Sequence, residues 1–243
     1  MTSHDDYSES GLILVDKPPD WTSHDVVNFI RRRFSISKVG HCGTLDPIAT
    51  GLLVVLLGRA TKLSARLVTQ DKVYAGALCL GVETHTQDRA GEVTATAETG
   101  EVTEAALRAT FARFCGPLLQ VPPMVSALKQ DGRRLYKLAR AGQEVDRAPR
   151  PIHIHRLEID AVELPMVRFT VHCSKGTYVR TLCADIGREL GCGAHLHDLR
   201  RLRSGNFRVD DAHTIETIKS WDRPTFISHM MPLASVVVGL MEN

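Results

Sequence analysis

Apolar residues recur along the chain with two different periods, and these periods predict both strands and helices. Six consecutive apolar residues at 52–57 are typical of a strand that is buried on both faces. At 72–81 apolar side chains fall on both sides of an alternating pattern, which predicts another strand. Further short strands are expected at 11–15, 152–159 and 167–173.

A helical period is strongest at 22–34 and at 179–190. The first of these helices can use Thr22 or Ser23 as its N-cap, and the second is followed by Gly191, a residue type that commonly ends helices. Further helices are expected at 60–68, 103–114, 134–141 and 214–221.

Turn-forming residues separate these elements. The segment 84–93 predicts a loop, and the segment 116–129, which holds three prolines, predicts an ordered loop or an edge strand. Residues 196–209 predict a strand or a hairpin. Strands and helices mix without a strict βαβ rhythm and without an internal repeat. The pattern therefore favours a mixed α/β (α+β) sheet in one domain over a doubly wound fold.

The two ends of the chain and its cysteines suggest where the protein works. Residues 1–10 are polar and acidic, unlike a signal or transit peptide, and are expected to be disordered, while 11–243 are expected to form a single domain. No apolar run reaches the roughly 18 residues that a membrane span requires. Six cysteines without a C-x-x-C pair predict reduced thiols. A cytoplasmic protein is expected.

The net charge is only +2, so the distribution of charge is more informative than its sum. Arginines cluster at 31–33, 133–140, 147–150 and 200–208, while acidic residues gather in the N-terminal tail and at 83–104. Such basic clusters can line one face and bind a polyanion such as RNA. They can equally be separate solvated surfaces, and the charge pattern leaves both interpretations open.

Motifs for nucleotide cofactors and metals are absent or incomplete. There is no G-x-G-x-x-G, and "GRATK" at 58–62 lacks the spacing of a phosphate-binding loop. The pairs "HIH" at 153–155 and "HLH" at 195–197 place two imidazoles on one strand face, but no acidic or cysteine cluster accompanies them. Because metal sites need three or four ligands, no metal is expected. Adjacent His41 and Cys42 point apart and do not suggest a nucleophile pair.

The stretch 39–51, "VGHCGTLDPIATG", carries a single carboxylate between two apolar segments. Pro47 favours an extended backbone at Asp46, and the glycines permit tight turns and close approach by a partner. Asp46 is therefore either a carboxylate held rigidly at a strand end or the cap of an Asx turn. The local pattern by itself favours the cap.

Five segments in order along the chain resemble the TruB family of pseudouridine synthases. "GHCGTLDPIATGLLVVLLGRATKLS" resembles the catalytic motif of this family, and "LVDKPPDWTSHDVV" resembles its N-terminal motif. "DKVYAGALCLGVETHTQDRAGEV" resembles the tyrosine strand and the loop after it. "PPMVSALKQDGRRLYKLARAGQEVDRAPR" resembles the central segment, and "CSKGTYVRTLCADIGRELGCGAHLHDLRRLRSGNF" resembles the arginine motif. Together they cover roughly residues 11–208.

This resemblance implies a pseudouridine synthase fold: a mixed, largely antiparallel sheet flanked by helices, with the active-site cleft across the sheet. It implies an isomerase that converts uridine 55 in the T arm of tRNA to pseudouridine without a cofactor or a metal. The target base would be flipped out of its stack. The implied partner is tRNA, with no membrane, and a monomer is expected.

The resemblance also implies three catalytic residues. Asp46 matches the catalytic aspartate, a nucleophile that attacks either C6 of the base or C1′ of the ribose, and the sequence leaves both open. Arg180 matches the arginine that pairs with this aspartate. Tyr74 matches the active-site tyrosine, which packs on the target base and is the candidate for removing the C5 proton.

Five further residues match substrate-binding positions of the family. His41 matches the histidine that fills the space left by flipped bases, or it is an ordinary loop histidine. Tyr178 matches a second pocket tyrosine, or it is a core aromatic that opens the following helix. Leu199 matches the residue that closes the uracil pocket. Lys17 and Lys62 match lysines that support the loop backbone and meet phosphate, respectively.

The chain departs from the family at two places. Val125 follows "PPM" where an aromatic residue is common, and the chain ends at Asn243 where longer members continue into an RNA-binding PUA domain. Residues 209–243 are therefore expected to be a C-terminal extension of a short form without that domain.

The sequence is also compatible with two functions other than that of an RNA isomerase. A tRNA-binding folding chaperone could use the same scaffold with little turnover, although pure binding does not require Asp46, Tyr74 and Arg180 together. A hydrolase with an aspartate nucleophile predicts a convergent histidine base and a metal or triad, which the sequence does not clearly offer.

Overall fold

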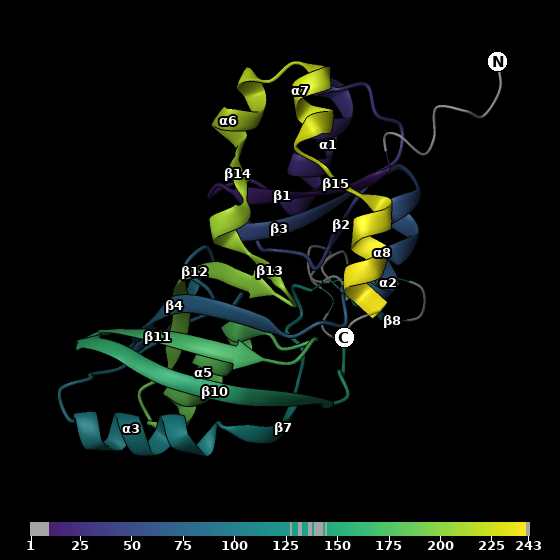
Figure 1. The fold of residues 1–243 in the computed structure, drawn as a ribbon. Coiled ribbons are helices and arrows are strands. Elements are labelled where there is room, and N and C mark those ends of the chain that lie inside the picture. Colours follow the sequence, from purple (N-terminus) through teal and green to yellow (C-terminus); the bar gives the residue numbers. More distant parts are fainter. Residues whose placement is uncertain are drawn as a thin grey trace. The chain divides into compact units, whose positions relative to one another are not determined.

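The computed structural model describes residues 10–126, 128–130, 133–135, 138, 143 and 145–241 (Figure 1). The chain divides into two compact units: unit 1 consists of Met1–Lys72 and Arg200–Asn243, and unit 2 consists of Val73–Leu199. The first nine residues of the predicted tail and most of the helix predicted at 134–141 lie outside the described residues.

Unit 1 is built on a mixed sheet with the strand order β14-β1-β3-β12. Strands β1 and β3 are antiparallel, whereas β12 runs parallel to β3 and β14 parallel to β1. The elements are β1 (Gly11–Lys17), α1 (Ser23–Arg33), β2 (Val39–Cys42), β3 (Thr50–Leu57), a 3₁₀ helix η1 (Gly58–Leu63), α2 (Ser64–Leu67), the end of β12 (Ala194–Ser204), β13 (Phe207–Arg208), η2 (Val209–Asp211), β14 (His213–Thr214), α6 (Ile215–Ser220), α7 (Arg223–Ser228), β15 (Met231–Pro232) and α8 (Leu233–Met241).

Both faces of the β1–β3 pair are buried, which confirms the prediction made from the apolar run at 52–57. On one face Val55 packs in a cluster with α1 and the C-terminal helices, where the rings of Phe34 and Phe226 stack at 3.9 Å between centroids. On the other face Leu14 and Val54 pack with Val236 of α8. The N-terminal and C-terminal segments of unit 1 thus contribute side chains to both clusters.

Helix α1 begins with a complete capping box, so of the two predicted N-caps the structure selects Thr22. The Thr22 hydroxyl accepts the Asp25 amide at 3.0 Å, and the Asp25 carboxylate accepts the Thr22 amide at 2.8 Å. Two backbone donors that have no partner within the helix are satisfied in this way. Ser23 is consequently the first residue of the helix, and its hydroxyl is available for another contact.

Three details of unit 1 differ from the sequence predictions. The helix expected at 60–68 is a 3₁₀ helix followed by one α-helical turn. Strand β2 was not predicted, because its period-2 signal is weak in "VGHC"; it pairs with β3 through His41↔Val55. The apolar tail forms α7 and α8 on either side of the short strand β15.

Unit 2 contains a second group of strands in the order β12-β4-β11-β10-β7. Its longest feature is the antiparallel pair of β10 and β11, and β7 pairs with β10 at the edge, as the proline-rich segment predicted. The elements are β4 (Lys72–Leu80), β5 (Val82–Thr84), β6 (Val93–Thr96), α3 (Glu104–Arg113), β7 (Gly116–Gln120), β8 (Lys129–Gln130), β9 (Arg133–Arg134), β10 (Arg150–Glu163), β11 (Met166–Cys173), α5 (Val179–Glu189) and the start of β12.

Helix α5 is the most deeply buried helix of unit 2. Leu182, Cys183 and Ile186 are at most 1% exposed, and Gly191 follows the helix with φ +80°. A residue in this left-handed conformation is best filled by glycine, so the predicted stop is confirmed. At Gly187 a Cβ atom would lie 2.2 Å from the backbone nitrogen of Ala194. Because glycine has no Cβ atom, β12 can start directly against the helix.

Candidate active site

The Asp46 loop connects β2 to β3 inside unit 1, and Asp46 itself is half-buried. The backbone carbonyl of Asp46 accepts the Ala49 amide at 3.0 Å, which closes a turn around Pro47. The carbonyl of Pro47 accepts the Asp20 amide at 2.9 Å. The loop is therefore tied by main-chain bonds both to itself and to the segment that follows β1.

Ser23 holds the residue immediately before Asp46. Its hydroxyl donates to the Leu45 carbonyl at 3.1 Å and accepts the Leu45 amide at 2.8 Å. Ser23 is 1% exposed and lies on the helix face of Val26 and Ile30. A polar residue at this helical spacing from apolar ones is the sequence signal that could have marked it.

Lys17 holds the residue immediately after Asp46. Its ammonium donates to the Pro47 carbonyl at 3.3 Å, and also to the carbonyls of Trp21 at 2.6 Å and Pro18 at 2.8 Å. The Lys17 side chain is fully buried at the end of β1. The bond to Pro47 is a contact with the loop backbone, which is the part of the protein that the family resemblance implies Lys17 supports.

Arg201 reaches the loop from β12 and joins its two ends. Its Nη2 donates to the Gly43 carbonyl at 3.0 Å, and its Nε donates to the Leu52 carbonyl at 2.7 Å. The side chain is 1% exposed. At Gly51, with φ +93°, a Cβ atom would lie 2.4 Å from the Arg201 carbonyl, so only glycine lets β12 approach here. The sequence signal for a buried Arg201 is its position two residues after Leu199, on the same face of a predicted strand. The surrounding run of arginines suggested a solvated surface instead.

The base of the Asp46 loop is rich in buried positive charge. Lys17, Lys72 and Arg201 are all buried, and Asp46 is electrostatically coupled to Lys17. The pKa of Lys17 is lowered to about 8, chiefly by burial and also by the positive Arg201, although the negative Asp46 and Asp20 act in the opposite direction. Charges are screened less in such surroundings than in water, so the loop offers a favourable place for an anion.

The depressed pKa of Lys17 makes the stability of the protein depend on pH. Because the pKa is about 8 when folded and 10.5 when unfolded, the unfolded chain binds the proton more tightly, and the free energy of unfolding rises with pH in this window. Relative to Lys17→Met, the wild type should gain about 2 kcal/mol between pH 7 and pH 9.5. Urea unfolding at both pH values measures this difference.

The surface variant Lys38→Met serves as the control for that experiment, since Lys38 is exposed in the same unit. Its unfolding curve should keep a constant offset from the wild type at the two pH values. If Lys17→Met also kept a constant offset, the buried ammonium would not be the origin of the effect.

Arg180 lies on α5 in unit 2, and it contacts three residues of the same unit. Its Nη1 donates to the Thr86 carbonyl and its Nη2 to the Val125 carbonyl, both at 2.8 Å. Its Nε lies 3.7 Å from the Asp88 carboxylate, and the side chains of both residues are less than a tenth exposed. The predicted pairing of Arg180 with Asp46 stays a prediction. Asp88 had no recognisable signal in the sequence.

The other predicted residues of unit 2 are also well ordered by their surroundings. Tyr74 and Leu199 are each 8% exposed, on β4 and β12. Tyr178 precedes α5, and the side chain of buried Gln120 holds its backbone, accepting the Tyr178 amide at 2.8 Å and donating to its carbonyl at 3.1 Å. In unit 1, His41 lies on β2 and is half-buried, and Lys62 is exposed on η1.

Comparison with protein families decides the relationship of this chain. The model described as TruB family pseudouridylate synthase (N terminal domain) matches residues 31–179, and the model for the tRNA pseudouridylate synthase B C-terminal domain matches residues 180–238. The chain belongs to the TruB family. The resemblance noted from the sequence is confirmed.

Individual relatives agree with this TruB assignment. The chain is 47% identical over 232 residues to tRNA pseudouridine synthase B of Opitutus terrae, covering 94% of this chain and 96% of the relative. It is 52% identical over 221 residues to tRNA pseudouridine synthase B of Syntrophotalea carbinolica, covering 90% of this chain and 72% of the relative.

Among solved structures, the fold is similar to a chain of a Cbf5–Nop10–Gar1 complex, with a TM-score of 0.75 and 29% identity over 97% of this chain and 64% of that chain. An H/ACA RNP bound to a substrate RNA containing 2′-deoxyuridine gives a TM-score of 0.71 at 26% identity over 98% of this chain and 63% of that chain. The predicted mixed α/β pseudouridine synthase fold is confirmed.

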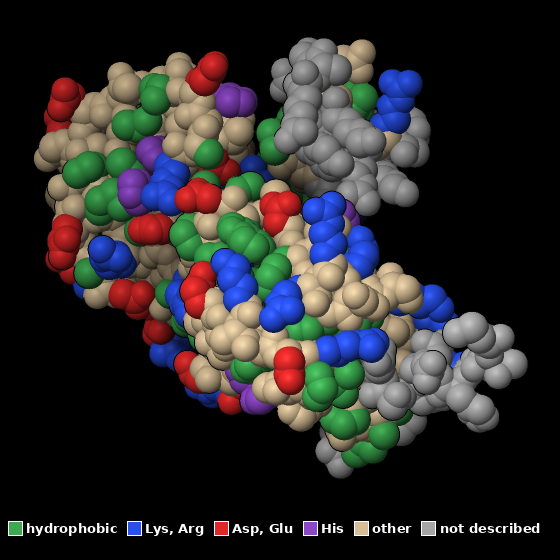
Figure 2. Space-filling model, turned by 90° about the horizontal axis from the view of Figure 1, so that it is seen from above, with side chains coloured by type: hydrophobic (Ala, Val, Ile, Leu, Met, Phe, Trp, Pro, Cys, Tyr) green, Lys and Arg blue, Asp and Glu red, His purple; other side chains and the backbone are tan. Residues whose placement is uncertain are grey.

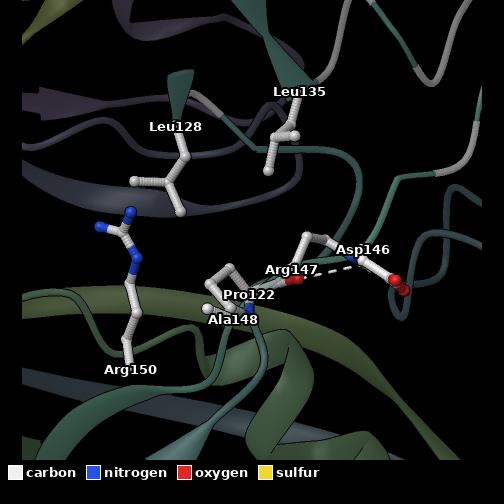
Figure 3. Close-up of a pocket in the computed structure, with 7 residues that line it drawn as sticks. All are labelled: Pro122, Leu128, Leu135, Asp146, Arg147, Ala148 and Arg150. Atoms are coloured by element: carbon white, nitrogen blue, oxygen red, sulfur yellow. Dashed lines mark hydrogen bonds between the residues drawn. The ribbon is translucent and has the colours of Figure 1, made fainter. Parts of the chain in front are cut away.

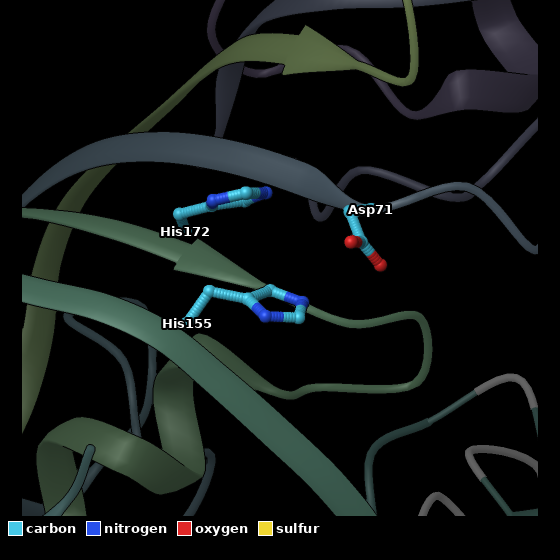
Figure 4. A group of neighbouring side chains, drawn as sticks. All are labelled: Asp71, His155 and His172. Carbon is cyan, nitrogen blue, oxygen red and sulfur yellow. The ribbon is translucent and has the colours of Figure 1, made fainter. Parts of the chain in front are cut away.

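The histidine pairs of this TruB-family chain have different surroundings. His155 of β10 and His172 of β11 face each other with ring centroids 4.6 Å apart (Figure 4), and the His153 ring lies 4.6 Å from that of His155. His195 is buried, with Nδ1 3.0 Å from the Val82 carbonyl oxygen. Within the described part of unit 2, no third ligand atom lies within 4.8 Å of both His155 and His172.

A pocket of about 510 Å³ opens in the central segment of the TruB-family sequence, within unit 2 (Figure 3). Arg147 is fixed at its wall because Nη1 donates to the Pro122 carbonyl at 3.2 Å. Basic, acidic and apolar side chains share the lining, which consists of Pro122, Leu128, Leu135, Asp146, Arg147, Ala148 and Arg150. A ligand with both a charged and an apolar part matches this mixture.

Basic side chains reach the surface among acidic ones on the face drawn in Figure 2. Arg200, in one of the predicted basic clusters, forms a two-pronged pair with Asp16 at 2.7 and 2.9 Å. Its neighbour Arg201 is buried, so a basic cluster in sequence is not always a basic surface. No helix in the described ranges is both long and apolar enough to cross a membrane.

Proposed function

We propose that this protein converts a uridine of tRNA to pseudouridine, and that its target is uridine 55 in the T arm. The observation that carries the proposal is the identity of 47% to a tRNA pseudouridine synthase B that is matched over 96% of its length. The family match of both halves of the chain supports the reaction class, an isomerisation that transfers a group within one molecule.

The reaction breaks the N1–C1′ bond of uridine, rotates the base and joins C5 to C1′. The proton on C5 is released to solvent and N1 gains one, so atoms balance without an external oxidant or reductant. We assign the nucleophile to the Asp46 carboxylate, which attacks C6 of the base or C1′ of the ribose. Support comes from the loop around it, which buried side chains fix on both sides of Asp46.

We assign supporting roles to the other family-matched residues. Tyr74 would pack on the target base and is the candidate for accepting the C5 proton. Arg180 would pair with the nucleophile during catalysis. Substrate contacts are proposed for His41, Tyr178, Leu199 and Lys62, and Lys17, which matches one of the family's substrate-binding positions, would support the backbone of the Asp46 loop.

The proposed partner is the T-arm stem-loop of tRNA, bound by a protein monomer in the cytoplasm. RNA loops are recognised through splayed bases and stacking, and Tyr74, Tyr178 and His41 supply rings of the kind required. The pocket offers Arg147 and Arg150 to a phosphate beside an apolar surface, and Asp146 also lies in its lining. Contacts of arginine with phosphate make binding sensitive to salt.

The proposal is tested by tritium release from a T-arm stem-loop labelled at C5 of uracil. The wild-type protein should release one tritium per stem-loop when only the target uridine is labelled, since that C5–H bond must break. A stem-loop with cytidine at the target position, labelled at its other uridines, is the matched control and should release none.

Two other outcomes would change the assignment. Release from the cytidine control would mean that the target lies elsewhere in the RNA. Tight binding of tRNA by filter retention with no release from any tRNA would replace the isomerase with an RNA-folding chaperone on the same scaffold.

A further inference from the structure

Three backbone carbonyls at alternate positions around Asp46 each accept a hydrogen bond from a different buried side chain. Arg201 binds the carbonyl of Gly43, Ser23 that of Leu45, and Lys17 that of Pro47. We propose that Ser23 and Arg201 are positioning residues, which set the place of the Asp46 carboxylate without touching the substrate. This inference rests on the proposed function, in which Asp46 is the nucleophile.

Ser23 acts on the loop and not on its own helix. The capping position belongs to Thr22, whose hydroxyl accepts the Asp25 amide, so the Ser23 hydroxyl is not needed to start α1. It binds both the amide and the carbonyl of Leu45 instead. The Leu45 carbonyl belongs to the peptide group that leads into Asp46 and the Leu45 amide to the one before it, so the two bonds restrain both peptide planes that precede Asp46.

Arg201 fixes where the loop leaves and re-enters the sheet. One guanidinium joins Gly43, just after β2, to Leu52 in β3, and it is 1% exposed. A Cβ atom on Gly43 would lie 3.3 Å from Nη1 of Arg201, which shows how closely the loop packs on this side chain. A shorter or uncharged side chain would leave two carbonyls without this donor and free the loop to shift.

Small displacements of a reacting group have large consequences for rate, on the order of 100-fold for 1 Å. Loss of the Ser23 hydroxyl removes both hydrogen bonds to Leu45, the residue before Asp46, but leaves the bonds from Arg201 and Lys17 in place. We therefore expect Ser23→Ala to lower the rate of the chemical step by roughly 10- to 100-fold. Binding of the RNA should change less than twofold, because Ser23 is buried and cannot reach it.

The neighbouring residue Thr22 provides the matched control. Thr22→Ala removes a hydroxyl one position away and weakens the helix cap, which lowers the urea midpoint but leaves the bonds to Leu45 intact. Similarly, Arg200→Met changes an arginine beside Arg201 that pairs with Asp16 and reaches the Thr50 hydroxyl, at the start of β3, only at 3.5 Å. These two variants report the effect of lost stability alone.

The experiment is a single-turnover tritium-release assay with excess enzyme and C5-labelled T-arm stem-loop, beside filter binding of the same RNA. Partial unfolding lowers the concentration of active enzyme, so adding more protein restores the rate, whereas misplacement of Asp46 lowers the rate constant at saturating enzyme. Ser23→Ala and Arg201→Met should show the second behaviour, and Thr22→Ala and Arg200→Met should match the wild type at saturation.

The outcomes separate this inference from the proposed function. If the wild type releases tritium and Ser23→Ala has the same saturating rate constant as Thr22→Ala, Ser23 does not position Asp46 and the inference is overturned. If the wild type releases none, the proposed function fails first. Should Arg201→Met not fold, Ser23→Ala, which keeps every buried charge, decides the question.

Discussion

Asp46→Asn is expected to abolish pseudouridine formation while RNA binding stays nearly intact. The amide is close in size to the carboxylate but is not a comparable nucleophile. The bonds from Ser23, Lys17 and Arg201 end on backbone atoms of other loop residues, so the substitution leaves them in place. Loss of a nucleophile costs on the order of 10⁴-fold or more in rate. Tritium release and filter binding measure the two quantities side by side.

Asp20→Asn is the matched control for this experiment. Asp20 is exposed, interacts electrostatically with the same Lys17, and has φ +63°, a conformation that asparagine tolerates well. The substitution therefore removes an equal charge from the same neighbourhood and keeps the backbone bond from the Asp20 amide to Pro47, so activity should remain within a few-fold of the wild type. Full activity in Asp46→Asn would contradict the assignment of the nucleophile.

Arg180→Met is expected to destabilise the protein by about 3–5 kcal/mol, the range for removing one partner of a buried ion pair. Asp88 is 7% exposed and would keep its charge in a buried place without the Arg180 cation 3.7 Å away. The carbonyls of Thr86 and Val125 would also lose a donor each. Urea unfolding measures the loss, and because it has a structural cause, activity must be compared at saturating folded enzyme.

Arg188→Met on the same helix is the control for Arg180→Met. Arg188 pairs with Asp185 at the surface, with 68% of its side chain exposed, so its removal should cost less than about 1 kcal/mol. The double variant Arg180→Met with Asp88→Asn should recover part of the stability, since the uncompensated carboxylate is then gone. A cost for Arg180→Met as small as that for Arg188→Met would show that Arg180 does not support unit 2.

These predictions affect how family-matched arginines are interpreted. Arg180 matches the partner of the catalytic aspartate, and its contacts with Asp88, Thr86 and Val125 also support unit 2. Val125 stands where an aromatic residue is common in the family. This difference affects only the side chain, because any residue at position 125 has the backbone carbonyl that accepts the hydrogen bond from Arg180. Loss of activity in an Arg180 variant does not by itself demonstrate a catalytic role.

Most secondary structure was predictable because its causes are local. The capping box of α1, the apolar run of β3 and the left-handed glycine after α5 each depend on residues within a few positions of one another. Strand β2 was missed because four residues with glycine and histidine carry little period-2 signal, and it is formed by pairing with β3. The ordered motifs were also sufficient to identify the TruB family.

The sequence by itself predicted Asp46 as the candidate nucleophile, because the stretch 39–51 offers one carboxylate and matches the catalytic motif of the family. Only the tertiary structure decided what holds that residue in place. The bonds from Ser23, Lys17 and Arg201 join residues 22, 30 and 158 positions apart in the chain. Serine at a helix start or arginine in a basic run has the same local pattern whether it faces water or a loop. The packing of distant strands decides whether these three side chains are buried and which way they point. For this reason all three support one loop.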